Sequence, residues 1–135
     1  MVEHRSRAVW EKRLKGIFDE IDDILEDRYG GLFPLHPRRA ARHATSNKEQ
    51  DGLFNVGASF TLGIGSRLGP GYVVEVRFST LSEVSEAMRR RIEREVAALL
   101  RKKLPSAFPA RRLRVQRDGG SYKIHGDLSL GSLMR

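Results

Sequence analysis

The chain has 135 residues, of which 39% are hydrophobic and 31% charged, a formal net charge of +8 and no cysteine. This length predicts a single domain over residues 1–135 that can form a core without crosslinks. The lack of cysteine excludes disulfides, thiolate zinc sites, iron–sulfur clusters and cysteine nucleophiles. No secretory leader pattern is present, and no apolar run approaches the roughly 18 residues needed to span a bilayer. We therefore expect a cytoplasmic protein with no membrane partner.

The positive charge is concentrated in the C-terminal part of the chain. Residues 81–135 contain 13 Lys and Arg against 6 Asp and Glu, so they carry +7 of the net +8. A surplus of this sign favours polyanionic partners, although it also keeps proteins in solution.

An amphipathic helix is predicted over residues 8–29. Its apolar residues recur at spacings of three and four and form one stripe: Trp10, Leu14, Ile17, Phe18, Ile21, Ile24 and Leu25. The opposite side is basic at Lys12 and Lys15 and then acidic at Asp19, Asp22, Asp23 and Glu26. We interpret the acidic stripe as a solvent-exposed face, because a hard cation would need ligands from a second element.

Residues 32–52 form a long basic connector that is either functional or flexible. Pro37 fits the first position of a short helix that would run to His43. Three arginines of this segment, Arg38, Arg39 and Arg42, could act as a flexible basic arm.

Two hairpins and a second helix are predicted in the remainder. Apolar residues alternate strictly from Phe54 to Ile64 and again over 72–78, which indicates two strands with one buried face. Thr80 and Glu83 fit a capping box that opens a helix ending at about Leu104, before Pro105. A second hairpin spans 112–128 around the turn Asp118-Gly119-Gly120.

The order helix, hairpin, helix, hairpin defines the predicted fold class. It is α+β, with two amphipathic helices packed on one face of a four-stranded antiparallel sheet. Phe54, Val56, Phe60, Val74, Val76, Phe78, Val115, Tyr122 and Ile124 should then share the buried face of the sheet.

The glycine-rich segment between the first two strands has two interpretations. Its exposed amides and one arginine could hold an anion, through Gly63, Gly65, Arg67, Gly69 and Gly71. The favoured alternative is a flexible hairpin connection, because a dinucleotide-binding loop would be followed by a helix and this one is followed by a strand.

No catalytic motif emerges from the sequence. His125 and Asp127 share a strand face at about 6.5–7 Å, too far for a direct orienting hydrogen bond. Ser59 and Thr61 could complete a triad only through a geometry that the sequence does not show. We therefore expect no catalytic residue, no metal site and no cofactor.

The basic surface is the main functional candidate. Its basic side chains fall into two sets. The sheet set is Arg77, Arg112, Arg114, Lys123 and His125, and the helix set is Arg90, Arg94 and Arg101. The aromatic residues of the strands take the buried phase, so no stacking platform is expected. The preferred hypothesis is a small basic binding module that contacts nucleic acid or another polyanion through phosphates. The alternative is a protein-interaction module or homodimer that uses the charge-split first helix or a sheet edge.

Overall fold

A computed structural model describes residues 2–128, with side chains from Arg7 onward. The elements follow one another as α1 (Val2–Tyr29), a short 3-10 helix (Lys48–Gln50), β1 (Phe54–Thr61), β2 (Gly71–Phe78), α2 (Glu86–Ala107), β3 (Leu113–Asp118) and β4 (Ser121–Gly126). The predicted α+β class, with two long helices and a four-stranded antiparallel sheet, is confirmed.

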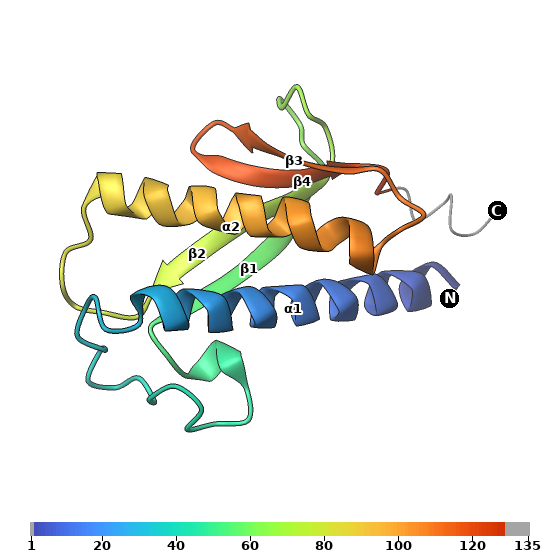
Figure 1. Ribbon diagram of the computed structural model, residues 1–135. Coiled ribbons are helices and arrows are strands. Elements are labelled where there is room, and N and C mark those ends of the chain that lie inside the picture. The colour runs from blue at the N-terminus through green and yellow to red at the C-terminus, as the bar shows by residue number, and fades with distance from the viewer. Residues whose placement is uncertain (1, 129–135) are drawn as a thin grey trace.

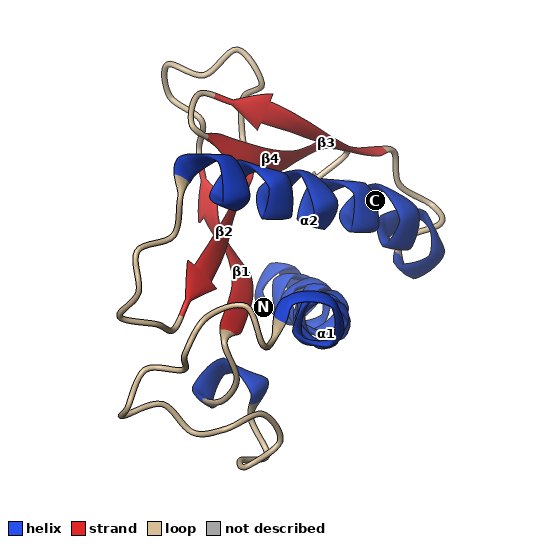
Figure 2. Cartoon of the chain, turned by 60° about the vertical axis from the view of Figure 1, so that its left-hand side comes forward, coloured by secondary structure: helices blue, strands red, loops and turns tan. Residues whose placement is uncertain are grey.

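The strand order is β1-β2-β4-β3, which places β2 and β4 at the centre and β1 and β3 at the two edges. The order is symmetric between the two halves of the chain, because each hairpin contributes one central strand and one edge strand. Each helix lies against the edge strand of its own half, α1 against β1 and α2 against β3, and the helices also contact each other (Figures 1 and 2).

One hydrophobic core joins the helices to the sheet. Both helices contribute to it, and the strand residues that enter it alternate along each strand, as period-2 patterning requires. Its least exposed members include Ile21, Leu25, Phe54, Ile92, Leu100 and Ile124. Trp10 stacks at 4.1 Å between ring centroids on Phe108, just after α2, and so ties the N-terminal half of α1 to the end of α2.

The predicted buried face of β1 extends too far. Thr61 ends the strand, and Gly63 then turns the chain at a φ of 74°. Beyond Ala58 the apolar side chains leave the core, since Phe60 is 41%, Leu62 66% and Ile64 91% exposed. The alternation indicated a strand correctly, but it could not show that the core ends near Ala58.

This correction can be tested by truncating two phenylalanines of the same strand. Phe54 is 1% exposed, so Phe54→Ala should cost about 3–5 kcal/mol of unfolding free energy. Phe60 is partly in water already, so Phe60→Ala should cost only about 1–2 kcal/mol. Urea denaturation of both variants measures the difference, and equal losses would show that Phe60 belongs to the core.

The boundaries of α2 also differ from the prediction. The helix begins after Ser85, whose hydroxyl accepts a hydrogen bond from the Met88 amide at 3.1 Å. Thr80 forms a local turn instead, because its hydroxyl accepts from the Ser82 amide. Pro105 lies inside the helix, and burial of Leu104 and Phe108 on either side holds the last turn despite the missing amide.

The acidic stripe of α1 is not the solvent-exposed face that we expected. Asp22 is 3% exposed and its Oδ1 accepts a hydrogen bond from the Val56 amide at 2.8 Å. Glu26 accepts from the amides of Leu53 at 2.6 Å and Phe54 at 3.2 Å. These carboxyl groups supply partners for amides at the start of β1, and just before it, that no neighbouring strand reaches. They tie α1 to the edge of the sheet.

The connector is held by two of its arginines. Arg39 donates to the backbone carbonyls of Glu49, Asp51 and Gly52, and Arg42 pairs with Asp27 at 2.8 Å. No helix forms between Pro37 and His43, so that prediction was wrong. Arg39 and Arg42 therefore do not form a free basic arm, whereas Arg38 is exposed.

Candidate functional site

Lys123, predicted on an open sheet face, is buried. The side chain is 2% exposed, and its Nζ lies 2.8 Å from Asp118 Oδ2, 2.8 Å from the Gly69 carbonyl and 3.0 Å from Ser66 Oγ. Ser66 also donates to Asp118 at 2.7 Å. Period-2 patterning placed Lys123 on the correct face but could not show that the segment between β1 and β2 folds over it.

This segment, residues 62–70, holds a cation rather than an anion. Its turns need positive φ at Gly63, Gly65 and Gly69, which only glycine adopts freely. The group that enters it is the Lys123 ammonium, with the Asp118 carboxylate beside it. The Lys123 ammonium and the Ser66 hydroxyl hold the pKa of Asp118 below its ordinary value. The Lys123 ammonium thus enters the segment in which an anion site was predicted at Gly63, Gly65, Arg67, Gly69 and Gly71.

His125 is also buried and takes no part in an open surface. Its Nε2 lies 2.6 Å from Gln116 Oε1 on the neighbouring strand. Burial lowers the pKa of His125, and the charges of Arg114 and Lys123 lower it further. The imidazole is therefore neutral near pH 7 and makes no contribution to a basic patch.

The basic residues of the predicted helix set and sheet set do not lie on two separate surfaces. Arg77 forms an ion pair with Glu75, and Arg90 pairs with Glu86 at 3.0 Å. Arg101 does not point away from the sheet, because its guanidinium donates to the Val115 carbonyl at 2.6 and 3.1 Å. This bond supplies an edge carbonyl of β3 with a partner, as the α1 carboxylates do for β1.

A basic edge results where α2 runs beside β3. Arg101 and Arg114 line the same groove of about 420 Å³, together with Gln116 and the core residues Leu104 and Val115. The guanidinium of Arg117 lies 5.3 Å from the Tyr122 ring centroid and that of Arg101 lies 6.0 Å from it.

Arg94 lies two turns before Arg101 on the same side of α2. We call Arg94, Arg101, Arg114 and Arg117 the α2–β3 basic edge. In the described part of the chain none of these four arginines forms a salt bridge. Sequence reasoning grouped Arg101 and Arg114 in opposite sets and missed Arg117, which shares the strand phase of the core residue Val115.

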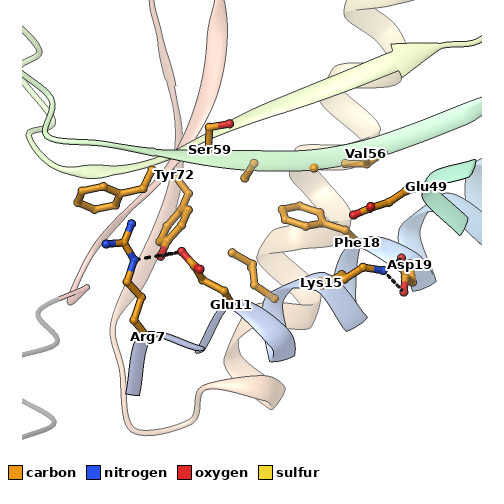
Figure 3. Close-up of a pocket in the computed structure, with 13 residues that line it drawn as sticks. Arg7, Glu11, Lys15, Phe18, Asp19, Glu49, Val56, Ser59 and Tyr72 are labelled. Atoms are coloured by element: carbon orange, nitrogen blue, oxygen red, sulfur yellow. Dashed lines mark hydrogen bonds and ion pairs between the residues drawn. The ribbon is translucent and has the colours of Figure 1, made fainter. Parts of the chain in front are cut away.

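A second groove, of about 510 Å³, lies between α1 and β1 (Figure 3). Its wall carries two ion pairs of α1, Arg7 with Glu11 and Lys15 with Asp19 at 3.1 Å. The Tyr72 hydroxyl donates to Glu11 at 3.0 Å. Burial and the Glu11 carboxylate raise the pKa of Tyr72 to about 12, so the phenol keeps its proton. The two ion pairs have the i,i+4 spacing of one helix, whereas Tyr72 and Glu11 come from separate elements and no sequence spacing brings them together.

The structure places no metal-binding cluster in the part of the chain that it describes, since nowhere there do three His, Asp or Glu side chains converge. The His125 ring pairs with Gln116 rather than with Ser59 or Thr61, so the triad geometry is not formed among the described residues. None of the helices among the described residues is long and apolar enough to cross a membrane.

A family model described as "Uncharacterised protein" matches residues 5–126, and the chain belongs to that family. A protein of Borreliella burgdorferi, described as an uncharacterized protein, is 36% identical over 107 residues, which cover 79% of this chain and 84% of the relative. No solved structure matches the chain. Neither description states an activity, so the function of the protein is unknown.

Proposed function

We propose that the protein is a small binding module without catalytic activity that contacts nucleic acid through its phosphates at the α2–β3 basic edge. The observation that carries the proposal is the convergence of four arginines on one edge with no acidic partner in the described part of the chain. Arg94 and Arg101 come from the helix and Arg114 and Arg117 from the strand beside it.

The surrounding charge supports this assignment. Residues 86–118, which form α2, β3 and their connection, contain 11 Lys and Arg against 4 Asp and Glu. Three of the four acids are already in ion pairs, Glu86 with Arg90, Glu95 with Arg28 and Asp118 with Lys123. The potential over this edge is therefore strongly positive and attracts a polyanion.

Phosphate contact is the mode that these side chains support. A guanidinium matches two phosphate oxygens with its planar pair of donors. The Tyr122 ring already has the guanidiniums of Arg101 and Arg117 against it, so it is a poor platform for base stacking. Binding through phosphates alone discriminates little between sequences.

Salt dependence follows from the number of phosphates neutralised. With four contacts on duplex DNA the log–log salt slope is about −3.6, so raising salt from 50 to 200 mM should weaken binding about 150-fold. Fluorescence anisotropy of a labelled 20-base-pair duplex, and of the matching single strand, measures the affinity at each salt concentration and so gives the slope.

A charge-matched pair of variants locates the site. Arg94→Glu/Arg114→Glu lowers the net charge from +8 to +4. The control Lys12→Glu/Arg38→Glu makes the same change at exposed cations elsewhere, neither with a salt bridge in the described chain. We expect the first variant to weaken binding at least about tenfold and to reduce the slope by about 1.8, and the control to bind nearly as well as the wild type.

Two results would contradict the proposal. If the wild-type protein binds neither duplex nor single strand at 50 mM salt, the surplus charge only maintains solubility. If both variants weaken binding equally, the attraction comes from net charge and not from this edge.

We further propose that both helices lie over the same face of the sheet, which leaves Arg114 at the boundary of the uncovered face, and that the protein acts in the cytoplasm, where nucleic acid is available.

A further inference from the structure

The free edge of β1 is covered along only half of its length. The amides of Phe54 and Val56 face away from β2, because they donate to Glu26 and Asp22 of α1. In an antiparallel pair every second residue points the same way, so the amide and carbonyl groups of Ala58 and Phe60 also face this edge. Within the described residues neither group has a hydrogen-bond partner.

The uncovered half opens into the groove between α1 and β1 (Figure 3). Leu14 and Phe18 of α1 and Tyr72 of β2 form its floor, and these side chains are only 3–5% exposed. The Phe60 ring, 41% exposed, lies at its end, 5.5 Å from the Tyr72 ring centroid. An unpaired strand edge beside a groove that ends in an exposed aromatic ring has the geometry that proteins use to add an extended peptide as a further strand.

The charges of the rim restrict the ligand further. Arg7 and Lys15 are each neutralised by a carboxylate on α1. Glu49 lines the same groove, and its carboxylate has no partner among the described residues. A basic side chain of the ligand would compensate this charge.

We propose that the β1 edge at Ala58–Phe60 binds an extended segment of a partner protein as a fifth strand. Alternate apolar side chains of the segment contact the groove, and a Lys or Arg lies beside Glu49. This site is separate from the α2–β3 basic edge, which lies at the opposite edge of the sheet.

A partner peptide fits this edge better than a second copy of the chain. In a second copy the β1 edge carries its own α1, and both helices would have to occupy the space in front of the paired strands (Figure 2). The acidic residues of α1 that could attract the basic half of another α1 already have partners within the chain: Asp22 and Glu26 accept from β1 amides, Asp19 pairs with Lys15, and Asp23 pairs with Lys48 and Arg42.

The test begins with a displayed library of random decapeptides selected against the immobilised full-length protein. Selected peptides are synthesised with a fluorophore, and their affinity is measured by anisotropy. We expect them to show alternating apolar residues with at least one Lys or Arg. Failure to select any binding peptide would overturn the proposal.

Two variants then probe the backbone and the charge. Ala58→Pro removes an amide that faces the free edge and leaves the bonds to β2 intact, so we expect at least about a tenfold loss of affinity. Glu49→Gln should weaken binding about threefold or more, whereas the control Glu83→Gln, an exposed acid remote from the groove, should not. Peptides that bind Ala58→Pro as tightly as the wild type would contradict strand addition.

A change in the peptide tests the same contact without altering the protein. N-methylation of alternate peptide amides removes donors to the β1 carbonyls, and one of the two alternating sets should abolish binding. Sedimentation equilibrium of the protein at about 100 μM, where even weak association would register, completes the test. A dimer that Ala58→Pro dissociates would replace the partner peptide with a second copy and so overturn the proposal.

Discussion

The unfolding free energy of the wild-type protein should fall as pH rises from 6 to 8.5, and Asp22→Asn should remove most of that fall. The pKa of Asp22 is raised from 3.8 to about 8, chiefly by burial and also by the nearby Asp19 and Glu26, against the opposing effects of the Val56 amide and Lys48. Between pH 3.8 and about pH 8 the folded state therefore binds more protons than the unfolded state. Stability from this group is greatest at low pH and is lost as pH rises through about 8.

The expected size follows from the linkage between proton binding and folding. Where a group is protonated in the folded state and ionised in the unfolded state, the unfolding free energy falls by about 1.4 kcal/mol per pH unit. The loss between pH 6 and 8.5 is therefore on the order of 2 kcal/mol. The Asp22→Asn variant keeps an oxygen for the Val56 amide and cannot ionise. Its stability should therefore change little over this range.

Urea denaturation at several pH values measures this effect, with Glu83→Gln as an exposed control that should follow the wild type. Asp22→Ala separates the hydrogen bond from the charge, because it leaves the Val56 amide unpaired at a cost of about 1–3 kcal/mol relative to Asp22→Asn. Parallel pH profiles for the wild type and Asp22→Asn would contradict the burial of an uncompensated carboxyl.

The second large effect is expected at Lys123, which holds the segment between β1 and β2. Lys123→Met keeps a stem that packs against Gly71 but loses the bonds to Asp118, Ser66 and Gly69. The segment should then open more often and expose the peptide bond after Arg67 to trypsin. We expect cleavage there to accelerate on the order of tenfold or more, since bonds from a charged donor stabilise by about 1.5–3 kcal/mol each.

Mass spectrometry of the fragments over time measures this cleavage. Lys102→Met is the matched control, because Lys102 is exposed on α2 and has no salt bridge in the described chain. Circular dichroism should show the same secondary structure in both variants. Equal rates of cleavage after Arg67 in the two variants would mean that Lys123 does not hold this segment in place.

Much of the fold could be predicted from periodicity. The spacing of Leu14, Ile17 and Ile21 indicated α1, and the alternation from Phe54 and from Tyr72 indicated the first hairpin. Glycines 119 and 120 marked the second turn, where Asp118 and Ser121 are paired. These signals are local, because each depends on the geometry of one helix or one strand.

What the sequence could not show depends on contacts between segments far apart in the chain. Asp22 and Glu26 have the spacing of a solvated helix face, and only the position of the β1 edge makes them partners of its amides. Lys123 has the phase of an exposed residue, and only the folded glycine-rich segment buries it. Arg101 and Arg114 come together because α2 packs beside β3, and no pattern within either element encodes this.

Unpaired backbone groups at the two sheet edges explain why the α1 acids and Arg101 do not face solvent as their spacing predicted. An edge strand has unpaired amide and carbonyl groups, and each helix supplies polar side chains to some of them. At β1 these are the carboxyl groups of Asp22 and Glu26, and at β3 the guanidinium of Arg101. This division leaves the surplus of unpaired arginines on the β3 side and a stretch of bare backbone on the β1 side.

The most direct test of nucleic-acid binding at the α2–β3 basic edge is an NMR titration of the full-length protein with a 20-base-pair duplex in 50 mM salt. We expect the backbone amide shifts that change most to lie in α2 around Arg94 and Arg101 and in β3 from Arg114 to Arg117, with little change at Lys12, Arg38 or the β1 groove. Changes that gather at Lys12 and Arg38, or no change at any amide, would contradict the assignment of this edge as the binding surface.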